Sequence, residues 1–253
     1  MWWLAAMLVP AAPAVEADRA GNHLVSFAAV GEAGADARHC TPDRRWCARL
    51  RAGGDNGGWT LEVTGPGAAP TRTLDQPADE DASDFAIRDH AVEQADGALL
   101  IGIEWRRSAG YSGGGASATT MQLVRVEPSG DPAPMLEVPI AASKDIRACF
   151  GDRDRRARRD ACADQYEFSA TLALDPDTTS GPPRFILTTN ARTYPGRRTL
   201  DSDSTTAPPL RARDLAWWRD PACSFRRVFR FDAAAEGYIA DAPLPECADY
   251  LEP

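Results

Sequence analysis

The sequence predicts an all-β fold, an antiparallel meander that forms a sandwich or a propeller-like arrangement with one or two short helices. Apolar and polar residues alternate with a period of two, as in 59–64 and 166–174, which is typical of half-buried strands. Helical periodicity is not sustained over any long segment. Short connections rich in Gly, Pro, Asp and Ser separate the alternating segments, and such connections favour antiparallel hairpins because parallel strands need longer crossovers.

The first element is an apolar leader. The apolar run 2–13 is shorter than the about 20 residues that a membrane-spanning helix needs, and small residues follow it. We therefore interpret 1–17 as a signal peptide and 18–253 as a single disulfide-stapled β domain. The alternatives are a buried N-terminal strand or a start codon upstream of the true one. No other stretch approaches the length of a spanning helix, so we expect no membrane span after signal cleavage.

The strands that follow are recognised by alternation and by the turn residues between them, such as the Gly-rich run 53–58. A further strand would place Trp46, Ala48 and Leu50 on its core face. In chain order, the remaining strands are expected at 24–30, 59–64, 99–105, 121–127, 135–140, 166–174, 184–193 and 225–231.

Helix is expected only in short pieces, at about 152–164 and 211–218. The segment 195–209 is rich in Pro, Ser, Thr and Asp, which is typical of a long surface loop. We place no domain boundary there, because the segment is short and its flanks are ordered.

Six cysteines lie in three couples with short spacings inside each couple and long gaps between them. Six cysteines allow 15 pairings, and the spacing favours the three sequential ones. An even, paired set behind a leader is typical of an oxidising compartment, so the sequence predicts a periplasmic or secreted protein. The predicted disulfides are Cys40–Cys47, Cys149–Cys162 and Cys223–Cys247.

The composition excludes one class of partner. The formal net charge is −9, which argues against nucleic acid because that affinity depends on Lys and Arg neutralising phosphates. Lys144 is the single lysine among 28 basic residues, and together with abundant Ala, Gly, Pro and Asp this indicates a GC-rich bacterial genome.

One motif suggests an enzyme. Residues 110–114, Gly-Tyr-Ser-Gly-Gly, match the G-x-S-x-G pattern of a serine nucleophile elbow and are similar to the sequence around the nucleophile of trypsin-like proteases. An elbow needs a helix after the serine and a histidine later in the chain. A strand follows Ser112, and His23, His39 and His90 all precede it. We therefore expect a Gly-rich hairpin loop, with a serine hydrolase using Ser112 as an alternative.

Metal sites are not expected. Residues 175–181 begin like a calcium loop, but the closing acid of an EF-hand would fall at Ile186. His39, Cys40 and Cys47 could offer three zinc ligands, but no fourth lies near them and an exported protein favours the disulfide. The sequence predicts neither a metal nor a cofactor.

An arginine-rich segment lies between Cys149 and Cys162. Residues 152–160 hold five Arg and three Asp, a charge of +2. Asp and Arg at i,i+4 spacing explain most of the run as a solvated, self-paired helix. Arg155 and Arg159 have no Asp four residues away, so they are the candidate anion-binding residues, with an anionic cell-envelope component as the possible partner.

Trp217 and Trp218 are adjacent, so on the helix expected there they point in directions about 100° apart. One is expected in the core. The other either covers a nearby apolar surface or offers a stacking platform for a sugar or a peptide.

The function that the sequence favours is an exported bacterial binding or scaffold protein without catalytic activity. The alternatives are a serine hydrolase using Ser112 and a carbohydrate-binding module using an exposed Trp. Acidic residues are too scattered along the chain to nominate a carboxylate pair for glycoside hydrolysis.

Overall fold

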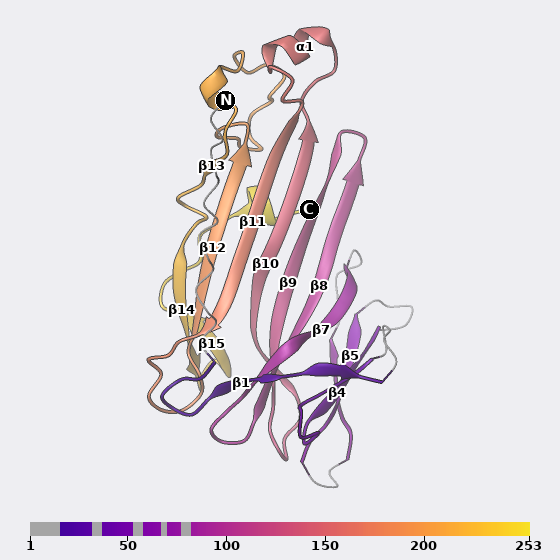
Figure 1. Ribbon diagram of the computed structural model, residues 1–253, viewed down its shortest axis with the longest axis vertical. Coiled ribbons are helices and arrows are strands. Elements are labelled where there is room, and N and C mark those ends of the chain that lie inside the picture. The colour runs from indigo at the N-terminus through magenta and orange to yellow at the C-terminus, as the bar shows by residue number, and fades with distance from the viewer. Residues whose placement is uncertain (1–15, 32–36, 53–57, 67–69, 77–81) are drawn as a thin grey trace, which may run out of the picture.

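The computed structural model of this protein describes residues 16–31, 37–52, 58–66, 70–76 and 82–253. In these residues almost all of the regular secondary structure is β-strand, and the strands form two antiparallel sheets in a sandwich-like arrangement with two short α-helices (Figure 1). The all-β prediction is confirmed. Most of the predicted signal peptide and most of the predicted turn at 53–58 lie outside the described residues.

The large sheet contains ten strands within the described residues, in the order β1-β7-β8-β9-β10-β11-β12-β14-β15, with β13 also paired to β12. From β7 to β12 each strand pairs with the next along the chain, so the predicted meander is confirmed here. The strands are β1 (His23–Ser26), β7 (Ala82–Glu93), β8 (Leu99–Tyr111), β9 (Gly114–Val126), β10 (Ala133–Arg147), β11 (Ala163–Leu174), β12 (Phe185–Tyr194), β13 (Trp218–Arg219), β14 (Arg226–Asp232) and β15 (Gly237–Ala240).

The small sheet has the order β2-β3-β4-β5-β6. The predicted strand at 24–30 is two strands, because the chain leaves the large sheet and enters the small one at Phe27. The Phe27 side chain is fully buried, and its backbone N–H donates to the carbonyl of Asp89 at 2.6 Å. The strands are β2 (Ala28–Val30), β3 (Arg38–Cys40), β4 (Cys47–Ala52), β5 (Trp59–Thr64) and β6 (Arg72–Gln76).

A first hydrophobic core lies between the two sheets. Leu61 and Val63 of β5 are fully buried in it, and burying such a side chain contributes about 1.5–3 kcal/mol. Trp46, Ala48 and Leu50 share this core, as the sequence predicts. The large sheet contributes Ile87, Ala91, Leu99, Ile101, Ile103, Val124 and Val126.

A second core forms where the large sheet folds over itself. β10 pairs with β9 over most of its length, but it pairs with β11 through Ala141–Arg147. Where β10 and β11 are not paired, side chains of β8, β9 and β10 pack against those of β11, β12, β14 and β15. Tyr238 meets Phe185 edge-on, with ring centroids 5.2 Å apart. The C-terminal hairpin therefore covers a face of the sheet that would otherwise be exposed.

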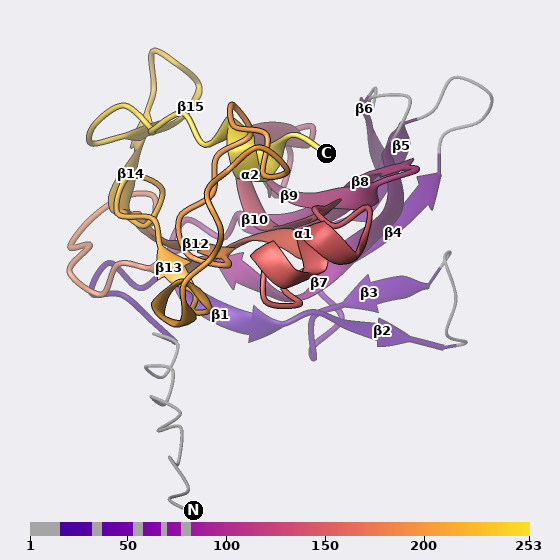
Figure 2. The ribbon, with the colours of Figure 1, turned by 90° about the horizontal axis from the view of Figure 1, so that it is seen from above.

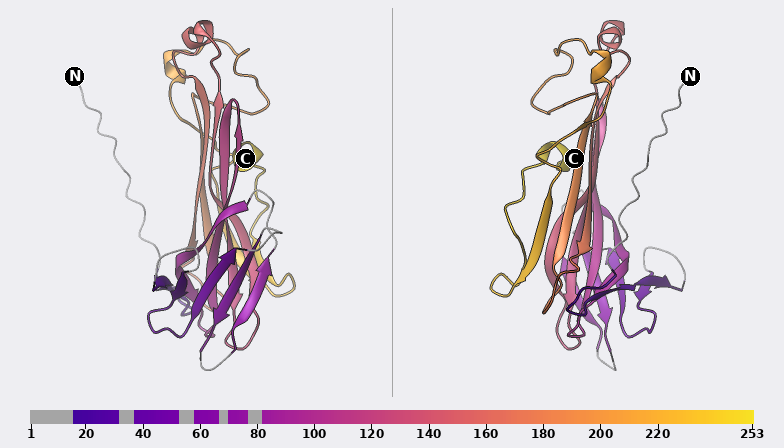
Figure 3. Two further views of the ribbon diagram at one scale, coloured as in Figure 1. Left: turned by 90° about the vertical axis from the view of Figure 1, so that its right-hand side faces the viewer. Right: turned by 60° about the vertical axis from the view of Figure 1, so that its left-hand side comes forward.

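The long strands carry the large sheet well beyond the small one (Figures 1 and 3). β10 has 15 residues, which at about 3.4 Å per residue corresponds to about 50 Å. We call the end remote from β2–β6 the distal end. It consists of the turn 112–113, the disulfide loop 149–162 and the connection 195–217. Seen along the strands, the helix of the disulfide loop lies over the end of the large sheet, with the small sheet on one side and β14–β15 on the other (Figure 2).

The first helix, α1 (Asp152–Ala157), is shorter than the predicted helix at 152–164. Arg159 and Asp160 both have positive φ, 52° and 65°, and the N–H of Asp160 donates to the carbonyl of Arg155 at 2.9 Å. This is the hydrogen-bond pattern of a Schellman closure, which ends a helix. The chain then turns back toward Cys162.

The helix predicted at 211–218 is wrong. A single 3-10 turn, η1 (Ala212–Asp214), forms there, and Trp218 belongs to β13 because it pairs with β12. The second helix, α2 (Ala248–Leu251), follows Cys247 and has no counterpart in the sequence-based expectation. Among the described residues, no helix is long and apolar enough to cross a membrane.

Candidate functional site

The three predicted disulfides are confirmed. Cys40 and Cys47 lie directly opposite each other in the β3–β4 pair, and Cys149–Cys162 closes the loop that contains α1. None of the six cysteines is free. Three disulfides indicate an oxidising environment.

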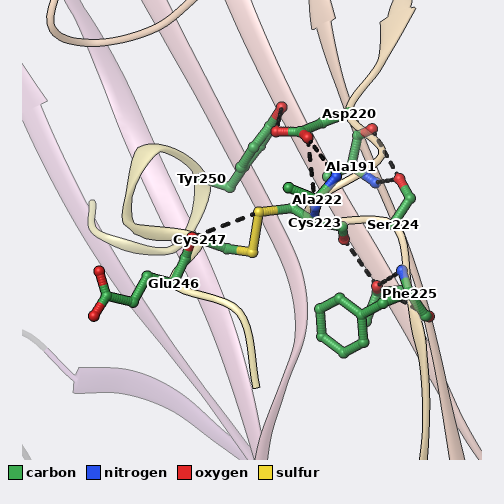
Figure 4. The surroundings of a disulfide bond; sticks show 10 residues. Ala191, Asp220, Ala222, Cys223, Ser224, Phe225, Glu246, Cys247 and Tyr250 are labelled. Carbon is green, nitrogen blue, oxygen red and sulfur yellow. Dashed lines mark hydrogen bonds between the residues drawn. A yellow bond between two sulfur atoms is a disulfide. The ribbon is translucent and has the colours of Figure 1, made fainter. Parts of the chain in front are cut away.

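The third disulfide, Cys223–Cys247, attaches the C-terminal segment to the large sheet (Figure 4). Beside it, the buried Tyr250 hydroxyl of α2 donates to Oδ2 of Asp220 at 3.2 Å. Oδ1 of the same carboxylate accepts from the N–H of Ala222 at 2.8 Å. Burial, reinforced by the Asp220 charge, raises the pKa of Tyr250, so the hydroxyl keeps the proton that this hydrogen bond uses.

The arginine-rich segment stands at the distal end, on α1 and the turn after it (Figures 1 and 2). Arg155, one of the two predicted anion-binding residues, is held by Asp160, with Nη2 to Oδ1 at 3.0 Å. Asp160 is five residues further on, a contact that i,i+4 spacing does not show and that the Schellman closure creates. Arg159 is exposed and occupies the left-handed position of that closure. Arg153 and Arg156 are also exposed, and no ion pair joins them to the described residues.

A buried ionic group fixes this segment to the sheet. Arg158 and Asp164 form a salt bridge in which each side chain is 5% exposed, and Nε of Arg198 lies 3.8 Å from the same Asp164 oxygen. Nε of Arg158 also donates to the carbonyl of Ala161 at 2.8 Å. Asp164 therefore joins the disulfide loop, strand β11 and the connection 195–217.

A second contact joins the two distal segments. The N–H of Leu210 donates to the carbonyl of Ala157 at 2.8 Å. Because α1 is only six residues long, it would not be stable alone. Its order depends on this bond, on the Cys149–Cys162 disulfide and on the buried ionic group.

Both tryptophans of the Trp217–Trp218 pair lie beside arginines. The Arg192 guanidinium is 4.4 Å from the Trp217 ring centroid, and the Arg197 guanidinium is 5.3 Å from that of Trp218. Adjacent residues of a strand point to opposite faces. Trp218 lies opposite Thr193, which is fully buried, whereas Trp217 is 39% exposed. Trp218 is itself only partly buried and belongs to none of the three hydrophobic cores of the described residues, so the expectation that one Trp lies in the core is not met.

Ser112 lies in the tight turn between β8 and β9, at the exposed tip of the distal end. All three histidines belong to β1, β3 and β7. In the β7–β8 pairing, the residue next to His90 lies opposite Ile101. From there Ser112 is eleven residues further along the hairpin, about 35 Å at the rise of a strand. A histidine therefore cannot take the proton of Ser112 in this structure.

The other sequence candidates have structural roles. Nη2 of Arg184 lies 2.6 Å from an Asp175 oxygen, and Oδ1 of Asp175 accepts from the N–H of Asp177, so the loop 175–181 is an Asx-type turn. Cys40 and Cys47 are joined in a disulfide, so they cannot supply zinc thiolates. Among the described residues, no group of three or more His, Cys, Asp and Glu could hold a metal ion.

Comparison with known proteins found no matching family model, no matching curated protein and no matching solved structure. Sequence reasoning missed Asp164 and Arg198, because their contact joins a strand to a distant loop. It also missed Arg192 and Arg219, although the alternation that identified β12 could have placed Arg192 on its outer face.

Proposed function

We propose that this chain is an exported binding protein, periplasmic or secreted and without catalytic activity, that engages an anionic component of the bacterial cell envelope through its distal end. The observation that carries the proposal is the group of exposed arginines on and after α1, held in place by a disulfide and by the buried Arg158–Asp164 pair. A rigid support reduces the entropy lost on binding, which favours recognition.

The charges in this segment divide into two sets. Arg158 is neutralised by Asp164 and Arg155 by Asp160. Arg153, Arg156 and Arg159 remain exposed to solvent. Because the whole chain carries −9, an anionic partner is repelled by most of the molecule. Asp152 and Asp154 lie among these three arginines, so the local excess is one positive charge, and this excess directs such a partner to the distal end.

An exposed aromatic residue lies beside these arginines. Phe150 is 62% exposed, and the Arg147 guanidinium lies 4.9 Å from its ring centroid. The backbone N–H of Phe150 donates to Asp154 at 2.8 Å, so the main chain that carries the ring is fixed. Aromatic residues and arginine are enriched in binding interfaces. Phe150 therefore offers apolar contact area next to the cationic group.

The alternatives differ in support. The serine hydrolase would need a base for Ser112, and the three histidines lie far from it. A scaffold role would not explain why arginines are exposed at the distal end. The carbohydrate-binding alternative has a specific observation in its favour, the exposed side chain of Trp217.

We expect the double variant Arg156→Gln/Arg159→Gly to weaken binding to an immobilised polyanion such as heparin by about three- to tenfold at low salt. Glycine suits the left-handed position of Arg159, so this variant removes two charges without straining the helix end. Binding would be measured by biolayer interferometry over a series of salt concentrations, because screening should weaken it in the same direction.

The matched control is Arg226→Gln/Arg230→Gln on β14, which removes two exposed arginines remote from α1. It should retain the affinity of the unmodified protein. Equal affinity for all three proteins, or affinity that does not respond to salt, would contradict a role for the distal arginines.

A further inference from the structure

Two arginines face each other across the β12–β13 pair. Arg192 and Arg219 are directly opposite in the register, so their side chains share one face of the sheet. Like charges in this position destabilise a strand pair. Glu167, next in register on β11, neutralises Arg192 through a hydrogen bond of 2.7 Å from Nε. Arg219 is exposed and forms no ion pair with the described residues. Among Arg192, Arg219 and Glu167, the positive charge of Arg219 is therefore left uncompensated.

Trp217 is held beside this charge. The Arg192 guanidinium covers part of the ring at 4.4 Å, and the Tyr194 ring centroid is 5.6 Å away at an interplanar angle of 43°. These two neighbours fix the orientation of the indole, yet 39% of the residue remains exposed. An exposed aromatic ring in a fixed orientation is a platform for the apolar face of another ring.

The sheet face next to this platform is polar and open. In the row that includes Glu167, Ser143 and Ser117 are the neighbours on β10 and β9, and their hydroxyls are 3.2 Å apart. Two residues from Glu167 along β11, and on the same face, the Gln165 amide donates to the Asp145 side chain on β10 at 3.0 Å. No described element covers this side of the distal half of the sheet in either Figure 1 or the left view of Figure 3. The face offers hydroxyl, carboxylate and amide groups in one plane.

We infer that Trp217, Arg219, Arg192 and Glu167 form a binding site for an acidic polysaccharide, one whose sugar units carry carboxylates. The inference rests on the proposed function, since it specifies the anionic component. A sugar ring stacks its C–H face on Trp217, and its hydroxyls bond to Glu167 and to the serines of the sheet. Its carboxylate pairs with Arg219, whose planar guanidinium matches a carboxylate in two hydrogen bonds.

The chemistry of the site favours this ligand over a simple anion. Inorganic phosphate or polyphosphate would use Arg219 but would leave the indole and the row of hydroxyls unused. A neutral glycan would use the indole and the hydroxyls but would leave the charge of Arg219 uncompensated. A carboxylate-bearing sugar chain uses the indole, the hydroxyls and Arg219 together. A flat face can also contact several linked sugar units at once, whereas a closed pocket cannot.

The test compares three probes: alginate as a polyuronate, dextran as a neutral glycan and polyphosphate as an anion without sugar. By isothermal titration calorimetry, the unmodified protein should bind alginate more tightly than dextran. Trp217→Ala and Arg219→Gln should each weaken alginate binding by about tenfold or more. Trp217→Phe should retain most of the affinity, because it keeps an aromatic face. Polyphosphate binding should be unchanged in Trp217→Ala.

Two matched controls remove similar groups elsewhere. Tyr111→Ala removes an exposed aromatic ring from the distal end, and Arg230→Gln removes one charge from β14. Both should bind alginate as the unmodified protein does. Alginate binding that Trp217→Ala leaves intact, but that Arg156→Gln/Arg159→Gly weakens, would overturn this inference and leave the proposed function standing. Binding to polyphosphate alone would also overturn it, and no binding to either polyanion would overturn both.

Discussion

Replacing Asp164 with alanine should lower the free energy of unfolding by about 3–5 kcal/mol, because removal of one partner leaves a buried charge uncompensated. Arg158 is 5% exposed, and its only other acceptor among the described residues is the backbone carbonyl of Ala161. In this variant Arg198 also loses its contact with the Asp164 carboxylate. Urea denaturation monitored by circular dichroism would measure the change, and the disulfide loop 149–162 should become accessible to protease before the rest of the sheet does.

The control for this substitution is Asp177→Ala, which removes an exposed partner of Arg19. Exposed ion pairs contribute about 0–1 kcal/mol, so the control should unfold almost as the unmodified protein does. If Asp164→Ala and Asp177→Ala cost the same small amount, then Asp164 does not hold the distal end together.

Removal of the Cys223–Cys247 disulfide by the double variant Cys223→Ala/Cys247→Ala should cost about 3–4 kcal/mol in the chain-entropy description. This bridge spans 24 residues of sequence, the widest of the three. It also holds α2 against the sheet, where Tyr250 meets Asp220 (Figure 4). Thermal denaturation would give the loss of stability, and limited proteolysis would show whether the segment 241–253 is released.

The comparison variant is Cys40→Ala/Cys47→Ala. Its bridge spans 7 residues and joins strands that already pair in register. It should cost less, and it should leave the C-terminal segment protected from protease. Protection of 241–253 in both variants would mean that the packing of Tyr250 is enough to hold α2 in place.

Local patterns predicted the strands and the disulfides well. Alternation identified the buried faces of β5 and β11, and the close spacing within each cysteine couple gave the correct three bridges. Both signals are local, and in this fold most strands pair with their neighbours in the chain. The sequence did not indicate that the strands continue to a distal end, because small residues such as Ala109, Ala116 and Ala118 weaken the alternation there.

Helix ends and ionic contacts were harder to predict. The segment 211–218 has a helical composition, but pairing with β12 places Trp218 in a strand. At i,i+4 spacing Arg155 has no Asp partner, but the positive φ of Arg159 and Asp160 turns the chain so that the Asp160 carboxylate reaches Arg155. The contact between Asp164 and Arg198 depends on the folded path of the connection 195–217, which no local pattern specifies.

The proposed function requires the distal end to bind an anionic envelope component. Hydrogen–deuterium exchange of the unmodified protein with and without alginate tests it most directly, since protection locates the bound surface without any substitution. We expect slower exchange in 152–160 and in 192–219, and unchanged exchange in the small-sheet strands β3 to β6. Protection confined to the small sheet, or no protection at alginate concentrations that saturate binding, would show that the distal end is not the binding surface.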